Sequence, residues 1–236
     1  MDEFSDLISA VQSDLNVSTN SSLYPSATIK LALNRAYNKS GALFKWPALQ
    51  DSQKTSTVAS QEYYEAPTTW RPNSIWRLEV DSVMYGQEPD GSPMSFDDFL
   101  IWKTDYSTST DKKWAVQWLR YFIHPIPTTN GSNNITIWGF KNVTELVNDS
   151  DTTIFSSNLP ECNDAIVMEA AAILKTKGEA ERSSQFVSTE AKQILSITFS
   201  KIKSESAKFE KNQPFFYTGD FYGKGYQGWD YDPTEF

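Results

Sequence analysis

The chain has 236 residues, of which 39% are hydrophobic, and its formal net charge at pH 7 is −9. This length and composition allow one sizeable folded domain or two small ones. The acidic balance argues against a cluster of Lys and Arg residues that would bind nucleic-acid phosphates. The one cysteine, Cys162, excludes an internal disulfide framework and any multi-cysteine metal site.

The sequence also lacks the features of membrane and secreted proteins. No run approaches the roughly 18 apolar residues that a membrane-spanning helix needs. The first residues, MDEFSDLISAVQ, have neither the basic segment nor the unbroken apolar segment of a signal peptide. We therefore expect a soluble protein, made in a reducing compartment, with no membrane partner.

Two helices are expected within residues 1–50. Apolar side chains recur at three- and four-residue spacing between Phe4 and Leu15, which indicates an amphipathic helix. Pro25 suits the first turn of a second helix, and Pro47 marks the boundary beyond its end. The chain is therefore predicted to begin with a pair of helices.

Residues 51–155 change to a strand-like pattern. After short β-type runs, residues 75–83 alternate between apolar and polar side chains. The run WAVQWLRYFIH, residues 114–124, is predicted to be the strongest strand of this region, and a strand over 135–140 follows it. The Asn-Gly pair at 130–131 lies between these runs and favours a tight hairpin. We therefore predict a central, mostly antiparallel β domain.

Helical patterns recur in two further places. Ser95 is a candidate N-cap with Asp98 at the third helical position, as in a capping box, which predicts a short helix inside the β domain. Later in the chain Ile166, Ala170 and Leu174 form an apolar stripe, and a longer amphipathic helix follows. The chain is therefore predicted to return to a pair of helices after the β domain.

The last segment, residues 213–236, has neither a helical nor a strand period. It is nevertheless too aromatic for an ordinary disordered tail. Such a segment can gain order by laying its rings on another surface. We expect an arm that contacts a neighbouring subunit or a partner protein through nine aromatic residues: Phe215, Phe216, Tyr217, Phe221, Tyr222, Tyr226, Trp229, Tyr231 and Phe236.

These patterns together predict the α+β fold class, in four segments. Residues 1–50 and 156–212 form helices that pack together as a bundle. Residues 51–155 form the central β domain, and residues 213–236 form the extended C-terminal arm.

His124 and Cys162 are the first candidates for chemistry. General acid–base catalysis by histidine needs an orienting partner and usually a nucleophile, and one His with one Cys cannot make a standard zinc site. His124 ends a strand before Pro125, so a structural role is favoured over that of a base or ligand. Cys162 lies beside a helix start, where a thiolate can be stabilised, but a small buried hydrophobe is the favoured interpretation.

Carboxylate groups are the second candidates, at Asp97/Asp98, Asp149/Asp151 and Asp230/Asp232/Glu235. None has the ligand spacing of an EF-hand, and solvated faces are favoured over a cation site. Paired carboxylates for glycoside hydrolysis stay open, because their separation is spatial rather than sequential. Phosphate-loop, dinucleotide and nucleophile-elbow motifs are absent from the sequence. We expect no enzyme activity, no cofactor and no metal.

Several short motifs stand at the joints between the expected elements. In chain order they are Tyr24-Pro25, Asn34-Arg35-Ala36, Trp46-Pro47-Ala48-Leu49, Thr55 with Thr57, Gln61-Glu62-Tyr63-Tyr64 with Pro67, Tyr121 to Pro127, and Leu159-Pro160 with Asp164-Ala165-Ile166-Val167. In this joint order the chain resembles the head-to-tail adaptor (connector) proteins of tailed bacteriophages, the group that includes the tail-tubular A type. The resemblance covers about residues 4–210. It departs from the family at the long insertion from YGQEP to TDKK and at the aromatic tail.

The resemblance implies a virion structural protein at the head–tail interface, assembled in the host cytoplasm. Such a protein forms a ring, usually dodecameric, that binds the portal protein on one side and a tail or nozzle protein on the other. Genomic DNA passes through its channel without sequence-specific binding. A net negative charge fits such a channel because it repels DNA, and ring closure needs a heterologous interface between neighbours.

Other functions stay open beside the adaptor. A carbohydrate-binding or enzymatic accessory virion protein would use exposed Trp and Tyr side chains to stack on sugars. A tail-completion protein would differ from an adaptor only in its partner.

Overall fold

The computed structural model describes residues 3–17, 22–86, 91–106, 108–175 and 181–210. Its chain divides into two compact units. The first combines Met1–Ala36 with Leu146–Phe236, and the second is Tyr37–Glu145. The chain thus leaves the first unit, builds the second, and returns, so the second unit is an insertion in the first.

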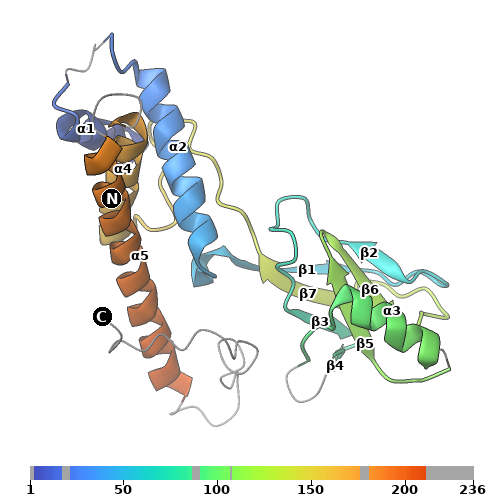
Figure 1. Cartoon of the computed structure of the whole chain (residues 1–236). Helices are drawn as coiled ribbons and strands as arrows, with labels where there is room; N and C mark the ends of the chain where they lie inside the picture. Colours follow the sequence, from blue (N-terminus) through green and yellow to red (C-terminus); the bar gives the residue numbers. More distant parts are fainter. Residues whose placement is uncertain (1–2, 18–21, 87–90, 107, 176–180, 211–236) are drawn as a thin grey trace. The chain divides into compact units, whose positions relative to one another are not determined.

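The first unit is helical. It contains α1 (Phe4–Asp14), most of α2 (Ser26–Leu43), α4 (Pro160–Lys175) and α5 (Glu181–Glu210). Figure 1 shows these four helices gathered together, with α4 lying against both α1 and α5. The predicted pairing of N-terminal helices with C-terminal helices is confirmed.

Apolar stripes explain this helical packing. The buried side chains of α1 recur every three or four residues, so this helix turns one face inward, whereas α4 is buried on nearly all sides. The buried side chains of the four helices include Phe4, Leu7, Val11, Ile29, Leu33, Ala36, Ile166, Ala170, Leu174 and Leu195. Most of the residues named from periodicity alone therefore lie in the core.

The second unit holds two antiparallel sheets. One has the order β1 (Gln50–Thr55), β7 (Ile135–Phe140), β3 (Arg77–Val80) and β4 (Val83–Met84). The other has the order β2 (Tyr63–Glu65), β6 (Arg120–His124) and β5 (Lys113–Gln117), with α3 (Phe96–Asp105) lying against it. A one-turn 3-10 helix, Pro47–Leu49, leads into β1. The predicted α+β class with antiparallel pairing is confirmed.

The core of this unit combines side chains from both sheets. Alternate residues of the strands point into it, as the two-residue period of a strand requires. The members with the least exposed surface are Trp70, Leu78, Trp114, Tyr121, Ile123, Ile135 and Ile137. The central region of the chain is therefore held by its own aromatic-rich core.

Two predicted features of the β region are wrong. Residues 114–124 do not form one strand: they form the hairpin β5–β6, with Trp118 and Leu119 as the turn. The Asn-Gly pair at 130–131 does not close a hairpin between β6 and β7, because these strands belong to different sheets. Residues 125–134 instead carry the chain from one sheet to the other.

The predicted N-cap of the short helix is confirmed. The backbone N–H of Asp98 donates to Ser95 Oγ at 3.1 Å, and Ser95 is the N-cap of α3. Asp97 and Asp98 both lie in the first turn, where negative charge is favoured by the helix dipole.

Candidate functional site

The nine aromatic residues predicted to make contacts, Phe215, Phe216, Tyr217, Phe221, Tyr222, Tyr226, Trp229, Tyr231 and Phe236, lie outside the described residues. So do Asp230, Asp232 and Glu235. The arm stays a prediction.

His124 lies at the end of β6 and is 6% exposed. Its Nε2 lies 2.8 Å from the carbonyl oxygen of Ser109, so the proton sits on Nε2 and is donated to that oxygen. The ring packs edge-on against Trp102, with 5.0 Å between centroids. Nδ1 is buried and has no hydrogen-bond partner among the described residues. These contacts give His124 a packing role at the α3–β6 contact.

Cys162 lies in the first turn of α4 and is fully buried. Burial raises the pKa of its thiol to about 11, and the hydrogen bond with Thr198 only partly offsets this effect. A thiolate nucleophile needs a lowered pKa and access to solvent. Cys162 therefore packs in the helical core as a neutral thiol.

The acidic pairs serve local structure. Asp98 accepts from the Ser95 hydroxyl at 2.6 Å, and Asp149 forms an ion pair with Lys30 at 2.7 Å. Asp151 accepts from the backbone N–H groups of Val147 and Asn148, and these bonds hold the pKa of its carboxyl below the ordinary value. No group of three or more His, Cys, Asp or Glu that could hold a metal occurs within the described part of the chain.

The motifs at the joints are structural. Asn34 is buried and bonds to both backbone groups of Leu146. Trp46, 1% exposed, donates its Nε1 proton to the carbonyl oxygen of Ser40 at 2.9 Å. The backbone N–H of Leu49 donates to the Trp46 carbonyl, which closes the 3-10 turn that Pro47 opens. The hydrogen bonds of Asn34, Trp46 and Leu49 therefore hold neighbouring segments of the chain together.

Arg71 is a structural cation that sequence reasoning missed. Its guanidinium donates to the carbonyl oxygens of Gly41 and Phe44, and to that of Lys141 at 3.1 Å. Burial of the side chain lowers the pKa of this guanidinium. Nothing in the sequence near Arg71 marks it, because the carbonyls it binds come from segments about 30 and 70 residues away.

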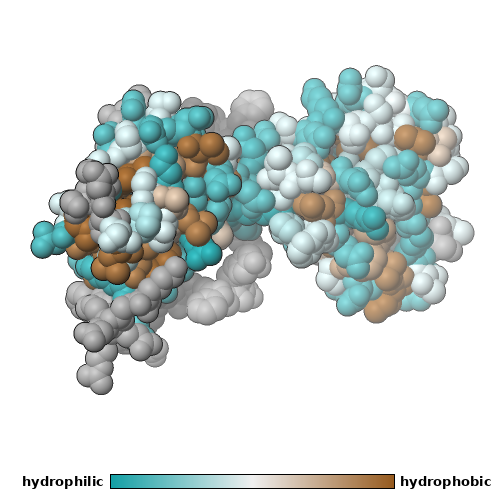
Figure 2. All heavy atoms as spheres, turned by 90° about the horizontal axis from the view of Figure 1, so that it is seen from above, coloured by the Kyte–Doolittle hydropathy of each residue, from teal (hydrophilic) through white to brown (hydrophobic). Residues whose placement is uncertain are grey.

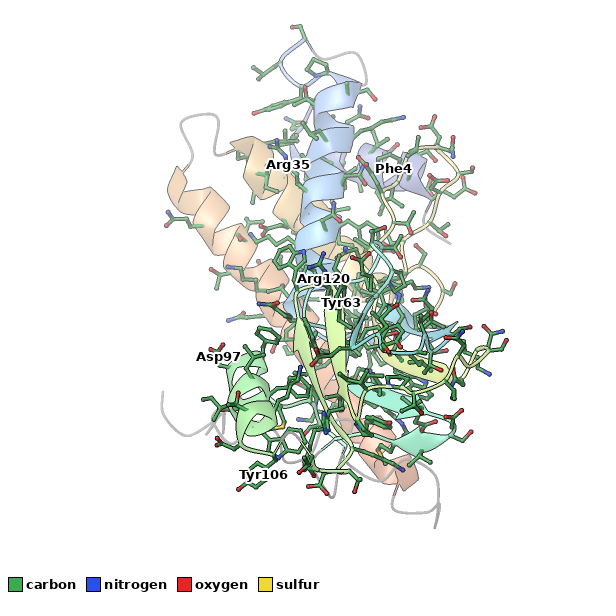
Figure 3. The ribbon with its side chains drawn as sticks, turned by 90° about the vertical axis from the view of Figure 1, so that its right-hand side faces the viewer. Phe4, Arg35, Tyr63, Asp97, Tyr106 and Arg120 are labelled. Carbon is green, nitrogen blue, oxygen red and sulfur yellow. The ribbon has the colours of Figure 1, made fainter. Side chains whose placement is uncertain are left out.

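The exposed aromatic surface of the β unit is the main candidate site. Trp118 is 65% exposed at the tip of the β5–β6 hairpin. Beside the tip, the guanidinium of Arg120 lies 5.4 Å from the ring centroid of Tyr63, and its Nε lies 3.5 Å from Glu65. Figure 3 shows Tyr63 and Arg120 close together at the same end of the strands. Trp, Tyr and Arg are the residue types enriched at binding hot spots.

A second exposed surface lies on α3. Its inner side packs Phe96 and Phe99 against Phe122, with centroid distances of 4.8 and 6.5 Å. Its outer side exposes Leu100 and Ile101. In Figure 2 apolar side chains gather over a broad part of the visible face of the helical unit and form smaller patches on the β unit.

Within the described residues no helix is long and apolar enough to span a membrane. No protein-family model matches the chain, and no curated protein matches it significantly.

Proposed function

We propose that the chain is a head-to-tail adaptor of a tailed bacteriophage, a structural protein that forms a ring below the portal and joins the capsid to the tail. The supporting observation is the insertion topology. Helices from both ends of the sequence build one unit, and the β unit is inserted between α2 and α4, in the element order of the adaptor family.

The motif residues lie where the elements of this topology meet. Those carrying the resemblance, among them Asn34, Trp46 and Leu49, make buried contacts at the joints between elements. Such contacts depend on element order rather than on any ligand. They support a shared architecture, and the function follows from the family resemblance.

The charge supports the same proposal. Specific DNA binding requires Lys and Arg on phosphates, whereas a channel that DNA must traverse works best without adhesion. The formal charge of −9 suits the channel. The ring would hold several copies of this chain, the portal on one side and a tail or nozzle protein on the other.

Electron microscopy of the full chain mixed with purified portal protein tests the proposal. We expect rings stacked coaxially on the portal. A chain that stays monomeric and does not bind the portal contradicts the proposal. A variant with all nine aromatic residues of 213–236 replaced by Ser tests the arm separately, because it keeps the length of the segment. If this variant still assembles and binds the portal, the arm is not the contact.

Carbohydrate binding is the rival function that one observation favours. Trp118 and Tyr63 are exposed aromatic side chains on one unit, and sugars stack on such rings. Glycan binding by a monomeric chain, lost in W118A and retained after removal of residues 213–236, would support it over the adaptor.

A further inference from the structure

Trp118 occupies a backbone conformation that is costly for its residue type. It is the first of two residues connecting the paired Gln117 and Arg120, and its φ is +61°. Glycine is the usual residue at a positive φ in a two-residue hairpin connection. A bulky side chain at positive φ stores strain, and such strain persists only where surrounding contacts enforce it.

Asn73 enforces this conformation. The N–H of Trp118 donates to Asn73 Oδ1 at 2.6 Å, and the N–H of Asn73 donates to the Trp118 carbonyl oxygen at 2.8 Å. Asn73 also has a positive φ, of +56°. Asparagine tolerates this conformation, so Asn73 can hold the costlier one of Trp118, yet the Trp118 side chain remains in solvent and gains little burial within its own unit. This arrangement presents an indole ring outward.

The same unit offers a surface of matching character on α3. Ile101 is 63% exposed and Tyr106, which follows the helix, is 58% exposed, and Leu100 is exposed beside them. Asp97 and Asp105 are exposed at the two ends of the helix. The outer side of α3 is therefore an apolar surface with an acidic rim.

The α3 surface begins beside the middle of the β5–β6 ladder, where Met94 bridges Ala115, and ends near His124, whereas Trp118 lies at the other end of the ladder. Trp118 follows the last β5–β6 pair, Gln117 with Arg120, while Tyr106 stacks on Trp102 beside His124, in the first pair. At about 3.4 Å per residue, the ladder separates these ends by about 14 Å. Figure 3 shows Arg120 and Tyr106 at opposite ends of the strands. Trp118 and the Tyr106 end of the α3 surface are therefore separated within one copy.

We propose that the Trp118 tip of one copy docks on the outer side of α3 in a second copy of this chain. The contact is heterologous, as ring closure requires, because the two surfaces differ. Charge complements the apolar contact: Arg120, whose side chain is 56% exposed, lies beside the tip and meets the acidic rim of α3. Glu65 pairs with Arg120 within one copy, but an exposed pair of this kind is weak. The proposal deepens the adaptor function and rests on it.

Disulfide trapping tests this contact with full-length chains and no other protein. Full-length Q117C, which keeps the Trp118 ring and carries its thiol on the exposed residue beside it, is mixed with full-length I101C under a mild oxidant, and the covalent dimer is measured on a non-reducing gel. The native Cys162 is buried, so the added thiols are the accessible ones. V83C is the matched control, because Val83 is an exposed apolar residue on the other sheet.

We expect a several-fold higher dimer yield for Q117C with I101C than for Q117C with V83C, because a disulfide needs Cα atoms within about 7 Å. Equal yields, absence of cross-linking in both mixtures, or dimers of Q117C alone overturn the proposal. Glycan binding at Trp118 without cross-linking would assign the ring to a sugar site instead. The portal is absent from this assay, so its outcome is independent of portal binding by the adaptor.

Discussion

The side chain of Asn34 and the backbone of Leu146 exchange two hydrogen bonds, although 112 residues separate them. Asn34 Nδ2 donates to the Leu146 carbonyl oxygen at 2.9 Å, and the Leu146 N–H donates to Asn34 Oδ1 at 2.9 Å. The chain leaves the helical unit after Ala36 and returns to it at Leu146. Asn34 therefore closes the helical unit at the base of the insertion.

Replacement of Asn34 by alanine is expected to lower the free energy of unfolding by about 2 kcal/mol or more. Both backbone groups of Leu146 would lose their partner, and each buried unsatisfied group costs about 1–3 kcal/mol. Urea denaturation followed by circular dichroism measures the change. N38A is the matched control, because Asn38 is exposed on the same helix, so both variants gain equally in helix propensity. Equal stability of the two variants would refute the role of Asn34.

Replacement of Arg71 by lysine is expected to destabilise the β unit by about 2 kcal/mol. A lysine ammonium lacks the planar fork that serves three carbonyl oxygens, and hydrogen bonds from charged groups are worth about 1.5–3 kcal/mol. R120K provides the control: Arg120 is exposed and its pairing with Glu65 is expected to contribute about 1 kcal/mol at most. Thermal unfolding of both variants measures how much more stability R71K loses than R120K. Equal losses in the two variants would mean that the hydrogen bonds of Arg71 do not stabilise the β unit.

The Cys162 thiol is expected to make stability depend on pH at the alkaline end. Its pKa is about 11 in the folded chain against 9.0 ordinarily. Between these values the unfolded chain binds fewer protons than the folded chain, so stability falls as pH rises. Below pH 9 the thiol is protonated in both the folded and the unfolded chain, so it does not make stability depend on pH.

Denaturant unfolding of the native chain and of C162A, measured from pH 8 to 11, isolates this effect, because other groups titrate alike in both proteins. The stability difference between them should be constant up to about pH 9 and then shift against the native chain. A constant difference throughout would mean that the thiol is not perturbed by burial. Alkylation of the folded chain near neutral pH should be correspondingly slow.

Replacement of Trp118 by glycine is expected to stabilise the chain while weakening self-association. Positive φ in a non-glycine residue costs about 1–3 kcal/mol, and glycine removes this cost. Glycine also has a greater conformational entropy in the unfolded chain, which lowers the stability of the folded chain by about 0.5–1 kcal/mol. A net gain of about 1 kcal/mol should appear in thermal unfolding. W118F is the control that keeps a Cβ and the strain but shortens the ring. If W118G is no more stable than W118F, Trp118 is not strained.

Local patterns were enough to predict the helices. The three- and four-residue spacing that begins at Phe4 and the stripe containing Ile166 and Ala170 mark faces that are buried in the structure. The N-cap at Ser95 was predictable because a cap involves residues only three positions apart. These features depend on neighbours along the chain, which the sequence displays directly.

The hairpin at Trp118 could not be predicted in the same way. Its turn contains no Gly, Asn or Pro, and the restraint comes from Asn73, 45 residues earlier. The Asn-Gly pair at 130–131 was misleading for a related reason, since strand partners are chosen by packing of whole sheets rather than by the turn between neighbours in sequence. Arg71 was missed because its acceptors are backbone groups, which no side-chain pattern identifies.

The amino-acid sequence by itself determined where this chain is helical, which helical faces are apolar, and that helices precede and follow a β region, because these properties follow from periodicity and element order. Only the tertiary structure decided that Asn34 meets Leu146, that Arg71 binds three carbonyl oxygens, and that Trp118 is held out in solvent. Those contacts join residues far apart in the chain, and their energy arises from burial and geometry that exist only after folding.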